Sequence, residues 1–199
     1  MTDIDRDAVV AAVGPGLGEG VRRGSAAILP ISVPGVAEAV TWLVRDDSLD
    51  HPLLAYVGRW PDGQVRVLSD DQAGWAALIA AVGAHIDSGA TAIGYVRQFL
   101  EMTRGPAVPV REVSGADELP WRPGSADEER RRADFLAGPP VPEPIVEPIG
   151  AGEGDGYHVE LTLLVGQRVQ RNLFDVAPDG RVDATFRVLA DDLPLPIVR

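Results

Sequence analysis

Three alternating segments near the carboxyl end constrain the fold of this chain more than any other feature. Tyr157–Val165, Arg168–Val176 and Arg181–Ala190 each alternate apolar and polar residues, which is typical of half-buried β-strands. The connections between them, Gly166-Gln167 and Pro178-Asp179-Gly180, have the length and composition of hairpin turns. The sequence therefore predicts a three-stranded antiparallel meander.

The turn lengths also predict the register of this meander. A two-residue turn at Gly166-Gln167 pairs Val159 with Phe174, and a three-residue loop pairs Phe174 with Ala184. A slip of one residue would move every side chain to the other face. We expect one face to be buried against helices in an α+β architecture. Its members are Tyr157, Val159, Leu161, Leu163, Phe174, Val176, Val182, Ala184, Phe186 and Val188.

The opposite face of the meander carries the candidate functional residues. The register places His158 across from Asp175, with Glu160 two residues further along the same strand. These three side chains are candidates for general acid–base catalysis, because a carboxylate can orient an imidazole and hold its tautomer. Arg171, which faces Thr162, and Arg187 are candidates for binding an anionic group. Asp183 continues this face on the third strand.

A simpler interpretation of the same face stays open. Many antiparallel sheets have one face in water, and opposite charges are common in cross-strand pairs on such faces. The polar residues would then be only the exposed side of the sheet. The site interpretation becomes stronger if the segment before the meander covers this face.

A helical hairpin is predicted between Asp70 and Gly105. Apolar residues recur at helical spacings from Trp75 to Ile86 and again from Ile93 to Met102. Asp70 or Asp71 can cap the first helix, which would include His85 near its end, and the pattern breaks around residues 87–89. Gly105 followed by proline ends the second helix.

The first seventy residues predict a short helix and a small sheet. Residues 14–20 contain a glycine run that does not match a dinucleotide-binding fingerprint, so we interpret it as a flexible connection. Pro61-Asp62-Gly63 predicts a second three-residue hairpin loop. The helix covers Asp3–Val13, and the strand candidates are Ala26–Val33, Glu38–Asp46 (a strand or a helical turn), Leu53–Trp60 and Gln64–Ser69.

Residues 106–156 are rich in proline, which interrupts regular structure repeatedly. Ser125 opens a capping box for a helix that continues to about Ala137. Pro139–Pro148 is either an extended strap across a surface or a disordered linker. The chain is thus one α+β domain over 1–199, or two β-rich halves (1–105 and 157–199) joined by 106–156. The apolar segment Leu193–Val198 is expected to dock on its own core or on a partner subunit.

Composition excludes several chemistries. The chain has no cysteine, so thiolate catalysis and cysteine-ligated metals are excluded, and the histidines lack metal-ligand spacing. Every basic residue is arginine, which indicates a GC-rich bacterial genome and excludes Schiff-base chemistry and a P-loop lysine. The net charge of −12 argues against nucleic acid and anionic membranes. We expect no cofactor and no metal, and a cytoplasmic location follows from the missing signal-peptide pattern.

Three functions remain compatible with the sequence. The leading hypothesis is a non-catalytic interaction or assembly protein, expected to be a homodimer, because the common catalytic motifs are missing. The alternative is a small-molecule-binding protein or cofactor-independent enzyme that uses His158, Asp175, Glu160 and Arg171. The third is an acidic mimic that sequesters a basic protein, whose binding would depend strongly on salt.

Overall fold

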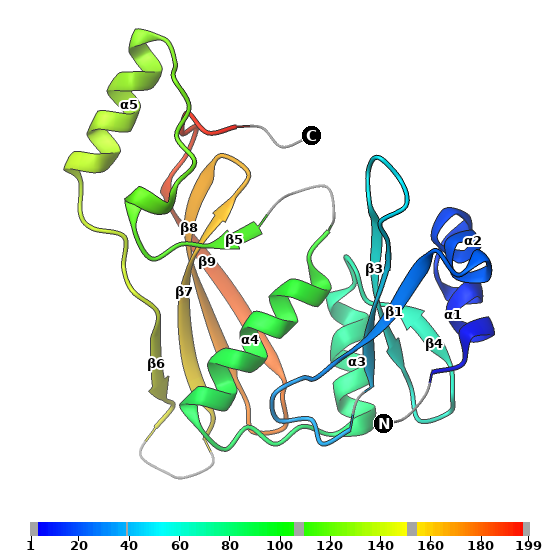
Figure 1. Ribbon diagram of the computed structural model, residues 1–199. Coiled ribbons are helices and arrows are strands. Elements are labelled where there is room, and N and C mark those ends of the chain that lie inside the picture. Colours follow the sequence, from blue (N-terminus) through cyan, green and yellow to red (C-terminus); the bar gives the residue numbers. More distant parts are fainter. Residues whose placement is uncertain (1–3, 39, 106–109, 151–154, 197–199) are drawn as a thin grey trace. The chain divides into compact units, whose positions relative to one another are not determined.

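The computed structural model describes residues 4–38, 40–105, 110–150 and 155–196 of the chain. The fold is α+β, with two antiparallel sheets, and its contacts separate it into two compact units (Figure 1). The first unit comprises residues 1–105 together with the loop Ala177–Arg181, and the second comprises 106–176 and 182–199. The α+β class predicted from the sequence is therefore confirmed.

The first unit places a four-stranded sheet between two pairs of helices. Alternation along β3 separates the two sides: Val57 faces the core formed with α1 and α2, whereas Tyr56 donates a hydrogen bond to Glu101 of α4. The sheet order is β1-β2-β3-β4. The elements are α1 (Arg6–Ala12), α2 (Pro15–Arg23), β1 (Ala26–Ile31), β2 (Thr41–Asp46), β3 (Leu53–Arg59), β4 (Val65–Val67), α3 (Gln72–Val82) and α4 (Gly89–Thr103).

The glycine run that we expected to be a flexible connection is instead helix α2, so that prediction was wrong. Pro15 stands at the first helical position, where its missing N–H costs no hydrogen bond. The glycines then allow close packing: a Cβ on Gly18 would lie 3.2 Å from the carbonyl oxygen of Val10 on α1. Small residues thus serve helix–helix contact here rather than flexibility.

The predicted helical hairpin is present as α3 and α4, with one correction. Asp71 caps α3 by accepting from the amide of Gly74, and Ser88 caps α4. However, α3 ends at Val82 because Gly83 adopts a φ of 80°. His85 therefore lies beyond the end of α3, and Ile86 is buried from a loop rather than from a helix face.

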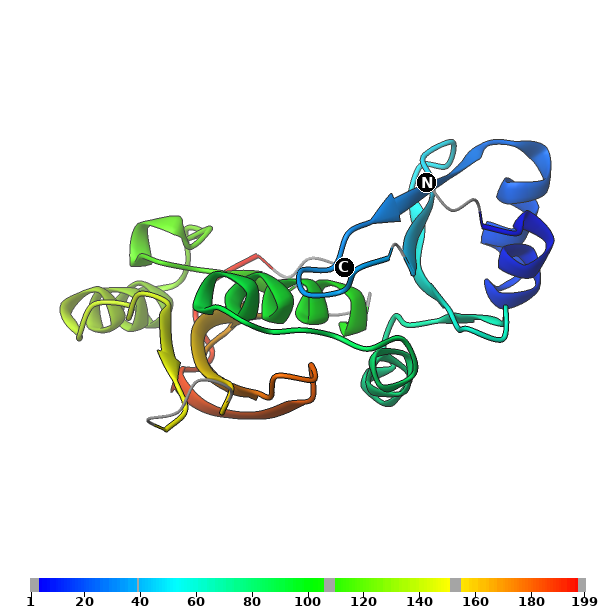
Figure 2. The ribbon, with the colours of Figure 1, turned by 90° about the horizontal axis from the view of Figure 1, so that it is seen from below.

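The second unit contains a five-stranded antiparallel sheet that is strongly curved (Figure 2). The strands follow the order β5-β7-β8-β9, and β6 also pairs with β7. The meander register agrees with the prediction, since Val159 pairs with Phe174 and Phe174 with Ala184. The elements are β5 (Val110–Glu112), the 3-10 helix Ala116–Glu118, α5 (Ala126–Ala137), β6 (Ile145–Pro148), β7 (Tyr157–Val165), β8 (Arg168–Val176) and β9 (Val182–Ala190).

The apolar face of the meander is buried only over β7 and β8. Val159, Leu161 and Phe174 are almost fully buried, as expected. On β9 the expectation was wrong, because Phe186 is 59% exposed and Val188 is 47% exposed. β9 is the last strand of the sheet. Near its end, Val188 pairs with Gln170 and Ala190 with Val169, so Leu189 is left without a partner and forms a β-bulge.

The proline-rich region contributes ordered structure to the second unit. The capping box at Ser125 is present and opens α5, as predicted. The last four residues of the strap form strand β6, which pairs with β7, with Pro148 inside the strand and Pro144 just before it. At the other end of the sheet, Leu193 and Leu195 are buried in a small core, which places the described part of the apolar C-terminal segment on its own unit.

Candidate functional site

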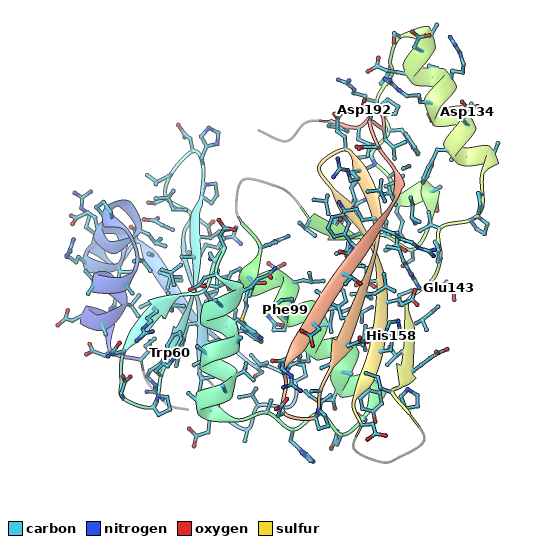
Figure 3. All side chains as sticks on the ribbon, turned by 180° about the vertical axis from the view of Figure 1, so that it is seen from behind. Trp60, Phe99, Asp134, Glu143, His158 and Asp192 are labelled. Carbon is cyan, nitrogen blue, oxygen red and sulfur yellow. The ribbon has the colours of Figure 1, made fainter. Side chains whose placement is uncertain are left out.

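The polar face of the second sheet gathers four of the five predicted site residues into one network. His158 and Glu160 stand two residues apart on β7, so both point to the same side of the sheet. Asp175 and Arg171 reach that side from β8, because the register sets Asp175 opposite His158 and Arg171 opposite Thr162. His158 lies where β7 runs beside β6 (Figure 3).

His158 lies between two carboxylates. Its Nδ1 is 2.7 Å from Oδ1 of Asp175, and its Nε2 is 3.2 Å from Oε1 of Glu160. A neutral imidazole has a single N–H and can donate to only one of them, whereas an imidazolium donates to both. The pKa of His158 is accordingly raised above its ordinary value of 6.5, chiefly by the hydrogen bond to Asp175.

Arg171 extends the network into the interior. Its side chain is 1% exposed, and its Nε donates to Oε2 of Glu160 at 2.8 Å. Its Nη1 donates to Thr162 Oγ1 and to the carbonyl oxygen of Pro142, both at 3.1 Å. Among the described residues its buried Nη2 has no hydrogen-bond partner. The arginine lowers the pKa of Glu160 below its ordinary value of 4.5.

Because Thr162 also donates to Pro142, the network ties the strap to the sheet. We call His158, Asp175, Glu160, Arg171 and Thr162, with the Pro142 carbonyl, the ionic clasp. The role of Pro142 was missed by sequence reasoning. A backbone carbonyl carries no signature in the sequence, and only the placement of the strap reveals it.

We expect the ionic clasp to stabilise the fold most between about pH 4.5 and 6.5. The raised pKa of His158 means that its contribution is complete below its ordinary value of 6.5 and is lost as the pH rises through the higher folded value. The lowered pKa of Glu160 means that its contribution is complete above 4.5 and is lost as the pH falls through the lower folded value. Urea unfolding at a series of pH values measures both limbs.

The variant His158→Gln should remove the loss of stability on the alkaline side. His51, in an exposed loop of the first unit, offers the matched control His51→Gln, which should keep that loss. An alkaline limb as steep in His158→Gln as in the wild type would contradict the assignment.

Arg187, the fifth predicted residue, does not join the clasp. It pairs with Arg171 across the β8–β9 ladder and lines a pocket of about 560 Å³ between α5, the strap and β9. Apolar side chains such as Phe135 and Leu189 form much of this pocket, and Arg131 also lines it. The α5 and strap segments thus approach the polar face of the sheet, which favours the site interpretation of the sequence.

The far edge of β9 is the other open feature of this unit. β9 pairs with β8 on one side, and no described strand pairs with its other side. Along this edge the side chains are exposed from Asp183 to Leu189. An unprotected edge strand presents unpaired N–H and C=O groups to another chain.

Neither a metal site, nor a membrane-spanning helix, nor a comparison with known proteins assigns a function to the described part of this chain. In the part of the chain that the structure describes, no group of three or more metal-ligating side chains is arranged to hold an ion. None of the described helices combines the length and apolar character that crossing a bilayer requires. No protein family, curated protein or solved structure shows significant similarity to this chain.

Proposed function

We propose that this protein is a non-catalytic interaction protein that associates with another polypeptide by adding a strand to the free edge of β9. One observation carries the proposal. The segment Val182–Val188 runs without a bulge along an unpaired sheet edge and exposes Phe186 and Val188 at 59% and 47%. Strand addition uses main-chain hydrogen bonds for affinity and side chains such as these for specificity.

The state of the ionic clasp supports the non-catalytic part of this proposal. A general base needs a ring nitrogen with a free lone pair. Both nitrogens of His158 lie within hydrogen-bond distance of a carboxylate, and its raised pKa favours the protonated ring. The Nε and Nη1 of Arg171 are likewise occupied by Glu160, Thr162 and Pro142. The clasp is better suited to holding the strap against the sheet than to moving protons.

A second candidate, binding of a small molecule, is favoured by the pocket between α5, the strap and β9. Its volume of about 560 Å³ falls within the range of ligand sites. Arg131 and Arg187 have no ion-pair partner among the described residues and would suit an anionic group on an apolar ligand.

Native mass spectrometry of protein from its source cells tests both functions at once, because it reports bound polypeptides and retained small molecules together. We expect the wild-type chain to occur in a complex with a polypeptide and Phe186→Lys to occur without it, since a lysine on an edge strand opposes strand addition. The control is Ile145→Lys, which also replaces an apolar side chain with lysine, at a 38% exposed position on β6.

Complexes that survive Phe186→Lys as well as they survive Ile145→Lys would contradict strand addition at β9. A small stoichiometric adduct on a wild-type chain without bound polypeptide would instead support the second candidate.

A further inference from the structure

We infer that the strand added to β9 is β9 of a second copy of this chain, antiparallel to the first, with the two-fold axis at Thr185. This inference rests on the proposed function and names its partner. The geometry points to one register, in which Asp183 lies opposite Arg187 of the second copy. Three observations lead to it: like charges within the sheet, the direction of the free backbone groups, and the position of the bulge.

Within one chain, the β8–β9 ladder sets like charges against each other. Asp175 is paired with Asp183, and Arg171 with Arg187. Like charges directly opposite one another destabilise a sheet. The β8 member of each pair is compensated, since Asp175 contacts His158 and Arg171 contacts Glu160.

The two β9 members are not compensated in this way. Among the residues that the structure describes, the Asp183 and Arg187 side chains have no ion-pair or hydrogen-bond partner. An anion and a cation therefore stand uncompensated on the same face of an open edge, four residues apart. An antiparallel copy can present each to the other.

The backbone determines which residues can bond across the free edge. In the hairpin loop, the amide of Ala177 donates to the carbonyl of Arg181, which makes 177 and 181 a hydrogen-bonded pair. Antiparallel ladders alternate, so the odd-numbered residues of β9 direct their backbone groups to β8. The N–H and C=O groups of Val182, Ala184, Phe186 and Val188 consequently point to the free edge.

An axis at Thr185 fits this alternation of even and odd residues. Ala184 then forms a hydrogen-bonded pair with Phe186 of the second copy, which sets a small side chain against a large one. Asp183 faces the second copy's Arg187 in a non-hydrogen-bonded pair, where side chains approach more closely. The ladder covers Val182 to Val188, which is the stretch of β9 before the bulge.

In the neighbouring registers, Asp183 no longer lies opposite Arg187 of the second copy. An axis at Ala184 sets Arg187 opposite Arg181 of the second copy, and an axis at Arg187 sets two Arg187 side chains opposite each other. An axis at Phe186 places Asp183 opposite Leu189, within the bulged region. Only the axis at Thr185 pairs both uncompensated charges, so electrostatics favours it among these registers.

Charge exchange tests the register. We expect Asp183→Arg and Arg187→Asp each to weaken self-association about tenfold or more, because both intermolecular pairs become repulsive. An equimolar mixture of the two variants should form a heterodimer of about wild-type affinity, since every pair is then opposite in charge. Analytical ultracentrifugation over a range of concentrations measures all three cases.

Both substitutions also replace a like-charge pair within the chain by an opposite-charge pair, with Asp175 or with Arg171. Loss of the dimer therefore cannot be attributed to a weakened sheet, and the urea midpoint of each variant should not fall. The control Asp50→Arg makes the same substitution as Asp183→Arg at an exposed loop of the first unit, and it should leave association unchanged.

A crosslink tests the axis separately. The chain contains no cysteine, so Thr185→Cys should form a single intermolecular disulfide across the axis on mild oxidation, whereas Ala184→Cys should not. If the mixture of Asp183→Arg and Arg187→Asp associates no better than either variant alone, the register is overturned.

A wild-type chain that stays monomeric at high concentration while Phe186→Lys still abolishes binding of another polypeptide would overturn the homodimer and leave the proposed function standing. If Phe186→Lys changes neither self-association nor the binding of another polypeptide, both the homodimer and the proposed function are contradicted.

Discussion

Replacing Arg171 with methionine is expected to destabilise the second unit by about 2–4 kcal/mol. The side chain is 1% exposed and connects Glu160, Thr162 and the Pro142 carbonyl. Methionine fills a similar volume but leaves Glu160, whose side chain is only 22% exposed, without its arginine partner. Removing one partner of a buried ion pair costs more than the pair itself contributes, because the remaining charge stays desolvated.

Urea unfolding and hydrogen exchange at the β7 and β8 amides measure this loss. Arg168 on the same strand is the matched control, since its ion pair with Asp191 is about half exposed, and Arg168→Met should cost much less than Arg171→Met. The double variant Arg171→Met/Glu160→Met should recover much of the stability, because it removes both charges. Equal losses for the variants at positions 171 and 168 would contradict the importance of the clasp.

Replacing Gly180 with alanine is expected to destabilise the first unit by about 2–4 kcal/mol. Gly180 has a φ of 83°, which alanine adopts only with strain. A Cβ there would also lie 2.7 Å from Ala84 Cβ and 2.9 Å from Ile79 Cγ2. In addition, the Tyr95 hydroxyl donates to the Gly180 carbonyl at 2.7 Å and accepts from the Trp75 indole at 3.1 Å, so any shift of the loop disturbs both bonds.

The chain provides its own control for this prediction in the other Pro-Asp-Gly loop. Gly63 has a φ of 85°, but a Cβ there would meet no atom within 4 Å. Gly63→Ala should therefore show only the backbone cost of about 1 kcal/mol. The difference between the two midpoints in urea measures the packing contribution alone. A Gly180→Ala variant as stable as Gly63→Ala would show that the loop relaxes freely.

Local signals in the sequence predicted much of the second sheet. Alternation and turn length were sufficient to predict the register, because a slip of one residue would expose the apolar side chains of β7 and β8. The same alternation was misleading on β9, where Phe186 is exposed. A period of two residues identifies which side chains share a face, but it carries no information on whether that face is covered at the edge of a sheet.

The glycine run and the candidate site each contain a feature that composition and register could not predict. Gly18 was interpreted as part of a flexible connection, although it lies buried inside α2. Helix propensity disfavours glycine, and only the tertiary contact with Val10 explains its presence. For the site, register alone brought His158, Asp175, Glu160 and Arg171 together. The burial of Arg171 depends on the strap, whose position no local pattern encodes.

The prolines of β6 limit how far any assembly of this sheet can grow. Pro144 and Pro148 lie beside and within the strand that borders β7, and a proline lacks the N–H that an added strand would need. The stretch of this border that β6 forms is thus poorly suited to pairing, while the edge of β9 remains available. Contact between two identical borders closes on itself. A sheet that pairs only through β9 can terminate at two copies, and the conversion of a β6 proline to a residue with an N–H would open a second edge for pairing.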